Sequence, residues 1–217
     1  MPIGHVDGTQ AKQPRNARQL LHETLAWLRQ TYRNRMPEEQ AHNTETRQPT
    51  QAQQLFFDVL DWLRDTYCTH RFFTERDVVW TVQKRLLHEA ASRNLRYRVF
   101  HNDRMTKGEA KSAPADLALL DPGNRAHLAI EFKYEPDHQR VRTEFPASKF
   151  PVVDWKEVTK DIERVQEFVR EEFTPRAISV FVDEGGHFRK RPAPPGSRWE
   201  EWDIGAGTRV AVLISEA

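Results

Sequence analysis

The chain has 217 residues, including 33 Lys or Arg and 32 Asp or Glu, so its formal net charge is only +1. A charge so near zero excludes a general electrostatic attraction to nucleic acid, and any such attraction has to come from local patches. The single cysteine excludes an internal disulfide and a paired-cysteine metal site, and no apolar run approaches the ~20 residues of a membrane span, so we expect a cytoplasmic protein without membrane contact.

Residues 1–51 are expected to form an N-terminal extension made of one helix and a polar linker. Leucines spaced by three and four positions predict the helix at about 17–35. Its motif Trp27-Leu-Arg-Gln-Thr-Tyr32 recurs as Trp62-Leu-Arg-Asp-Thr-Tyr67 in a second predicted helix, at about 52–67. Two alternatives stay open: the two helices share only a convenient apolar stripe, or the first one packs beside the second or docks on a partner, either a second copy of the chain or another protein.

Residues 52–217 are expected to form one α/β domain, in which a mixed sheet is flanked by helices. After the helix at 52–67, Thr74 is predicted to cap a helix that runs to about Ala91, with the acidic residues Glu75 and Asp77 in its first turn. Trp80 lies at helical spacing and is expected in the core. The predicted apolar stripe of this helix is Val78, Val79, Val82, Leu86 and Leu87.

The rest of the domain is predicted to continue with strands, one more helix and two irregular segments. The order of helix, three strands, helix, strand and final strand is typical of a mixed sheet with helices on its faces. Asp154 is expected to cap the second helix of this series. The predicted elements are strands at 95–100, 115–120 and 127–134, a charged connection at 135–152, a helix at 154–172, a strand at 177–182, an irregular segment at 192–207 and a strand at 209–214.

Charged residues interrupt the two apolar strands of the hairpin at 115–134. Asp116 lies in the first strand, and Glu131 and Lys133 lie in the second. Side chains alternate across a strand, so Glu131 and Lys133 share one face. Burying charge is costly unless it is compensated, and carboxylates beside an ammonium are suited to holding a divalent cation and activating water. The alternative is a Glu–Lys pair on the exposed face of an edge strand.

The register of this hairpin depends on its loop. A four-residue loop at 121–124 sets Asp116 opposite Ala129, whereas a two-residue loop at Gly123-Asn124 sets Asp116 opposite Glu131. Both registers place Asp116 on the face of Glu131 and Lys133, within reach of a cross-strand neighbour. A slip by one residue would separate the three charges.

The chemistry of these residues fits a metal-dependent nuclease. Carboxylate oxygens suit Mg²⁺, which binds through one or two carboxylates together with a substrate phosphate, and we expect Mn²⁺ to substitute. A bound ion polarises the phosphate and makes a water more acidic, while a lysine stabilises the negative charge that develops. No Ser–His–Asp or Cys–His arrangement competes, and the nine histidines lack the HxxxH and HExxH spacings, which argues against a zinc site.

The region of about residues 74–183 resembles the PD-(D/E)xK, or restriction-endonuclease-like, nuclease superfamily. The resemblance rests on a helix with a glutamate, a strand with Pro114-Ala-Asp116, a strand with Glu131-Phe-Lys133, and a following helix and strand. Ala115 separates the proline from the aspartate, which departs from the usual motif. The resemblance implies a restriction-endonuclease-like fold and hydrolysis of phosphodiester bonds.

The same resemblance implies roles for individual residues. Asp116 and Glu131 would ligate the metal, with the backbone carbonyl of Phe132 as a further ligand, and Lys133 would orient or help to deprotonate the attacking water. Glu75 matches the helical acidic residue that contacts metal-bound water or a second ion. Asp77 and Glu89 are the less favoured candidates for that position.

Contact with nucleic acid is expected from local basic patches that bind phosphates without reading sequence, although any one of these residues could equally be solvated surface. We expect DNA rather than RNA as the substrate and an endonuclease of repair, restriction or defence, but nothing in the sequence rules out a ribonuclease. A non-catalytic subunit that keeps the fold and docks through its N-terminal helices is the alternative function. The candidate phosphate-binding residues are Lys84, Arg104, Lys107, Lys111, Arg189, Lys190 and Arg191.

Overall fold

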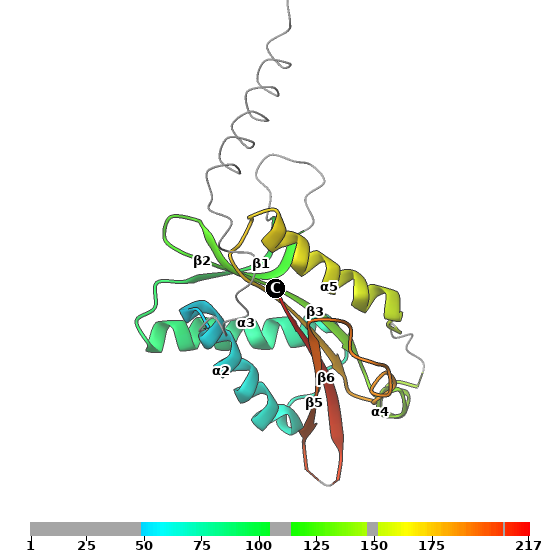
Figure 1. Ribbon diagram of the computed structural model, residues 1–217. Coiled ribbons are helices and arrows are strands. Elements are labelled where there is room, and N and C mark those ends of the chain that lie inside the picture. Colours follow the sequence, from blue (N-terminus) through cyan, green and yellow to red (C-terminus); the bar gives the residue numbers. More distant parts are fainter. Residues whose placement is uncertain (1–48, 105–113, 147–151, 206) are drawn as a thin grey trace, which may run out of the picture. The chain divides into compact units, whose positions relative to one another are not determined.

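The computed structural model describes residues 49–104, 114–146, 152–205 and 207–217 (Figure 1). Pro49–Ala217 group together as one unit of the chain. The helix expected at 17–35 and most of the linker lie outside the described residues, so the N-terminal extension and its boundary stay predictions. No helix in the described part of the chain is both long enough and apolar enough to cross a membrane.

Six strands form one mixed sheet in the order β1-β2-β3-β4-β6-β5. The neighbours β3 and β4 are parallel, and all other neighbouring pairs are antiparallel. This arrangement confirms the predicted fold class. The strands are β1 (Arg98–Arg104), β2 (Pro114–Leu120), β3 (Ala126–Glu135), β4 (Ala177–Asp183), β5 (Ser197–Asp203) and β6 (Arg209–Glu216).

Helices cover both faces of the sheet. Helices α2 (Gln51–Thr66) and α3 (Glu75–Ser92) pack on one face and contribute to the main hydrophobic core with β3 residues such as Ile130 and Phe132. Helix α5 (Trp155–Arg170) covers the other face, as Figure 1 shows, and packs over β3, β4 and β6. In the described part of the chain, the remaining helices are a 3₁₀ turn, η2 (Tyr67–Thr69), and the short α4 (His138–Glu144).

The end of α3 explains why the first strand begins later than predicted. Asn94 has a φ of 55°, and the Leu95 N–H donates to the Ala90 carbonyl at 2.8 Å. This left-handed residue followed by a bond back to the last turn is a Schellman-type helix end. The cap therefore uses Leu95, and β1 begins at Arg98 rather than at residue 95.

Two predictions about the α3 core face were wrong. Trp80 is 51% exposed and Leu87 is 45% exposed. Trp80 is two positions from both Val78 and Val82, or about 200° around the helix, so it cannot share their buried face. Residues Val78, Val79, Val82, Leu86 and Ala90 form that face.

The segment predicted to be irregular, 192–207, contains a strand, and the predicted charged connection, 135–152, contains a short helix. Strand β5 lies within 192–207, and its Trp202 is 1% exposed in the main core. Helix α4 lies within 135–152 and buries only Val141. Neither element shows a strong apolar pattern in sequence, because β5 is an edge strand with one largely exposed face and α4 is too short for a stripe.

Candidate active site at a fork in the sheet

Strands β2 and β3 stop pairing where the charged residues of the hairpin begin. Their register runs from Leu119 opposite Leu128 to Leu117 opposite Ile130. Beyond that point β2 stays paired with β1 as far as Pro114, and β3 stays paired with β4 as far as Glu135. The sheet therefore forks, and we call this opening the β2–β3 fork.

Extended by one residue past Leu117 and Ile130, the register would set Asp116 opposite Glu131, as expected for a two-residue loop, but a different turn produces it. The turn spans Asp121 to Arg125, closed by an Asp121 N–H bond to the Arg125 carbonyl at 3.0 Å. Leu120 pairs with Ala126, and an irregularity between Leu119 and Leu120 shifts the register by one residue. A β-bulge at Leu119 and Leu120 thus offsets the extra length of the loop and restores the register expected for a two-residue loop.

The Asp116 carboxylate replaces a main-chain acceptor at the fork. Its Oδ2 accepts a hydrogen bond from the Phe132 N–H at 2.8 Å. In a strand the N–H and C=O of one residue point toward the same neighbouring strand, so the Phe132 carbonyl also faces the fork. One carboxylate and one carbonyl oxygen therefore lie at the same opening.

Glu131 is a buried carboxylate that is only partly compensated. The residue is 2% exposed, and its Oε2 lies 3.2 Å from Nη1 of Arg164. Its Oε1 is buried without a hydrogen-bond partner among the described residues. Burial and, after it, the charge of Asp116 raise the pKa of Glu131 to about 9, although Arg164 opposes the shift. No donor among the described residues therefore contacts this oxygen.

Lys133 bridges two other carboxylates. Its Nζ lies 3.0 Å from Oε2 of Glu75 and 3.4 Å from Oδ2 of Asp161. Burial lowers the pKa of Lys133, but the charges of Asp161 and Glu75 outweigh it and leave the pKa above its ordinary value. The ammonium is therefore protonated at neutral pH.

Sequence reasoning missed two members of this cluster, Asp161 and Arg164 on α5. Asp161 is 5% exposed, and its Oδ1 lies 3.4 Å from Nη1 of Arg164. The sequence did indicate a special role for Asp161. It lies on the apolar stripe of α5 between Val158 and Val165, where a charged side chain is unusual without a buried partner. We call the six residues Glu75, Asp116, Glu131, Lys133, Asp161 and Arg164 the hairpin site.

The hairpin site contains more negative than positive charge. Four carboxylates face two cations, Lys133 and Arg164, so the fully ionised cluster carries two net negative charges. Burial raises the pKa of both Glu75 and Asp161, each opposed by Lys133. All-oxygen donors, an unpartnered buried oxygen and a double negative charge fit a hard divalent cation such as Mg²⁺.

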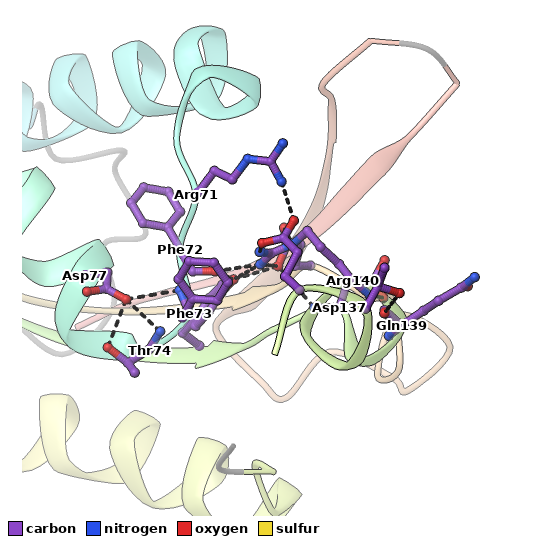
Figure 2. A network of polar contacts seen from close by, with 12 residues as sticks. Arg71, Phe72, Phe73, Thr74, Asp77, Asp137, Gln139 and Arg140 are labelled. Carbon is purple, nitrogen blue, oxygen red and sulfur yellow. Dashed lines mark hydrogen bonds and ion pairs between the residues drawn. The ribbon is translucent and has the colours of Figure 1, made fainter. Parts of the chain in front are cut away.

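The two other acidic candidates on α3 have structural partners. The Asp77 carboxylate accepts hydrogen bonds from the N–H groups of Phe73 and Thr74, at 3.0 and 2.8 Å, and so closes the start of the helix (Figure 2). Glu89 pairs with Arg85 and Arg93 toward the other end of α3. Of the acidic residues considered on this helix, Glu75 is the one that contacts the hairpin site.

The predicted phosphate-binding residues are only partly described. Lys84 is exposed on α3, and Arg189 and Lys190 are exposed after β4. Arg191 lies over the Trp155 ring at 5.1 Å from its centroid, which gives it a packing role. Arg104 ends β1, whereas Lys107 and Lys111 lie outside the described residues.

Comparison with known proteins gives no family. No protein-family model matches the chain, and no curated protein matches it in sequence. What is established is an α/β fold with a mixed six-stranded sheet and flanking helices. The relationship to the PD-(D/E)xK superfamily therefore remains a proposal.

Proposed function

We propose that the protein is a Mg²⁺-dependent nuclease of the PD-(D/E)xK type, which hydrolyses phosphodiester bonds and acts as a DNA endonuclease. The observation that carries the proposal is the excess of four carboxyl groups over two cations in the hairpin site, which amounts to two net negative charges when all are ionised, with the buried, unpartnered Oε1 of Glu131 beside Asp116. A divalent cation would neutralise this charge. The element order α3-β1-β2-β3-α4-α5-β4 also contains the helix, hairpin, helix and strand on which the resemblance to the superfamily rests.

Asp116, Glu131 and the Phe132 carbonyl are the groups that would hold the cation. When bound, Mg²⁺ polarises the scissile phosphate and increases the acidity of a coordinated water. Glu131 can act as a ligand through its unpartnered Oε1, while its Oε2 keeps the contact with Arg164, 3.2 Å away.

Lys133 is assigned an electrostatic role. The charges of Asp161 and Glu75 keep it protonated, so it lacks the lone pair that a general base needs. An ammonium can instead orient the attacking water and stabilise the charge that develops on the phosphate oxygens. Glu75 and Asp161 position it, at 3.0 and 3.4 Å.

A cleavage assay tests the proposal. Supercoiled plasmid, single-stranded DNA and RNA are each incubated with Mg²⁺, Mn²⁺ or EDTA. We expect metal-dependent cleavage of DNA, and a loss of at least about 100-fold in Glu131→Gln and in Lys133→Met, since each removes a group that acts in the transition state.

Matched controls lie on the exposed side of α5. Glu163→Gln and Lys160→Met remove the same kinds of charge from exposed positions and should cleave like the wild type. If Glu131→Gln and Lys133→Met both keep wild-type cleavage, the hairpin site is not the active site. Cleavage of RNA alone would change the substrate class without changing the site.

A non-catalytic nucleic-acid-binding or docking subunit is the second candidate function. It is favoured by the contacts of Lys133 and Arg164, which link Glu75, Asp161 and Glu131 by ion pairs. In such a protein the cluster would be structural. A folded protein that binds DNA but cleaves no substrate in either metal would support this alternative.

A further inference from the structure

A second group of potential metal ligands lies at the C-terminal end of β3. Glu135 is the last residue of β3, His138 is the first residue of α4, and His187 lies in the turn after β4. One ligand atom from each lies within 4.8 Å of the others. Among the described residues, only these three potential metal-ligand side chains come so close together, and we call them the histidine site.

Glu135 places a buried negative charge at this site. The residue is 0% exposed, and its Oε2 accepts a hydrogen bond from the Val153 N–H at 2.6 Å. Its Oε1 contacts Nε2 of His138. Asp183, the β4 partner of Glu135, is also 0% exposed. Two adjacent buried carboxylates favour a cation close by.

The turn after β4 holds His187 in place. The carboxylate of Asp183 accepts hydrogen bonds from the His187 N–H at 2.9 Å and from the Phe188 N–H at 2.6 Å. The imidazole lies across Gly185, where an added Cβ would overlap Nε2 of His187. A glycine at this position therefore leaves the space that the ring occupies, and the ring stacks on His138 with 4.1 Å between centroids.

Helix α4 is fixed from its other side. Asp137 caps the helix by accepting hydrogen bonds from the Gln139 and Arg140 N–H groups at 2.7 and 3.2 Å. Arg140 donates to the Phe72 carbonyl at 2.5 Å and pairs with Glu184 at 2.6 Å (Figure 2). These bonds tie α4 to the segment before α3 and to the end of β4. His138, at the start of α4, is therefore placed by the surrounding structure.

We propose that Glu135, His138 and His187 bind a divalent transition-metal ion, with Zn²⁺ as the best match. One carboxylate and two imidazoles are a known type of zinc ligand set, whereas Mg²⁺ prefers oxygen ligands alone. His187 lies on an exposed turn, so its side chain can leave the stack on His138 and turn a ring nitrogen toward the ion, at the ~2 Å bonding distance of zinc.

A position for a further ligand opens to solvent. Both histidines line a pocket of about 590 Å³, which Asp137, Arg142 and Thr143 also line. An open position of this kind accepts water or an anionic group, and Arg142 would favour the anion. The proposal does not depend on the nuclease proposal, because it uses none of the residues of the hairpin site.

Metal binding to purified, chelator-treated full-length protein tests the histidine site. Calorimetry with Zn²⁺ should show binding at one site. Bound Co²⁺ should give visible absorption bands typical of a low coordination number with nitrogen and oxygen ligands. His187→Ala should weaken Zn²⁺ binding by at least about tenfold, since it removes a ligand from an exposed turn. Gly185→Ala should weaken binding while it keeps all three ligands, because the new Cβ displaces the His187 ring.

Two controls make the test specific. His88→Ala removes an exposed histidine on α3, and Asp116→Asn alters the hairpin site; both should bind Zn²⁺ like the wild type. The proposal is overturned if the wild type binds no Zn²⁺, or if His187→Ala binds it with unchanged affinity. Zn²⁺ binding that is lost in Asp116→Asn and kept in His187→Ala would assign the metal to the hairpin site instead.

Discussion

Glu131 has an environment that favours its neutral form as long as no cation is bound. Its Oε1 is buried without a described partner, and its Oε2 shares Nη1 of Arg164 with Asp161. The raised pKa of Glu131 reflects this shortage of groups that stabilise the charged carboxylate. Burial of Glu131 in β3 therefore disfavours its charged form, and a bound metal ion would supply the positive charge that stabilises it.

The pKa of Glu131 predicts how stability depends on pH in the metal-free protein. Below about pH 4.5, the reference value, the folded and unfolded states both hold the proton. Between 4.5 and about 9, only the folded state holds it, so the free energy of unfolding falls as pH rises, with a slope of up to ~1.4 kcal/mol per pH unit from this group. Glu131→Gln should remove this fall, as measured by urea unfolding in EDTA between pH 5 and 9.

Glu163→Gln is the matched control for this measurement, because Glu163 is exposed on α5. It should keep the wild-type pH dependence. A Glu131→Gln variant with the same pH dependence as the wild type would contradict the assignment of a raised pKa to this carboxyl group.

At the scale of elements, the hairpin and α5 were predictable because their patterns are strong. Strands β2 and β3 carry long apolar runs, and α5 is capped by Asp154, whose side chain accepts a hydrogen bond from the Lys156 N–H at 3.0 Å. The bulge at Leu119 and Leu120 was not predictable, since a single-residue shift leaves no pattern in sequence. The exact partner of Asp116 therefore required the structure.

Two tryptophans differ sharply in their exposure to solvent, and this difference gives a test of the assigned core. Trp202 on β5 is 1% exposed and lies edge-on to Tyr67, whereas Trp80 on α3 is 51% exposed. Trp202→Ala should lower the free energy of unfolding by about 3–5 kcal/mol, because it leaves a large cavity. Trp80→Ala should change it by less than about 1 kcal/mol. Chemical denaturation measures both, and equal losses would contradict the burial of Trp202.

At the scale of the whole domain, β3 joins the two candidate metal sites. Glu131, Lys133 and Glu135 alternate along one face of this strand, so the histidine site begins where the hairpin site ends. Sequence reasoning predicted the part of the first site that lies on two consecutive strands, Asp116, Glu131 and Lys133, and missed the residues of α5. It missed the second site because His138 begins α4 and His187 follows β4, and their meeting depends on the parallel pairing of β3 and β4.

The two sites should respond to different metals, and melting curves can separate them. Mg²⁺ should raise the melting temperature of the wild type and of His187→Ala but not of Asp116→Asn. Zn²⁺ should raise that of the wild type and of Asp116→Asn but not of His187→Ala. A metal at 100 times its dissociation constant adds about 2.7 kcal/mol, or about 5–10 °C for a domain of this size. If one variant abolishes both shifts, a single site binds both metals; if neither variant changes either shift, both assignments fail.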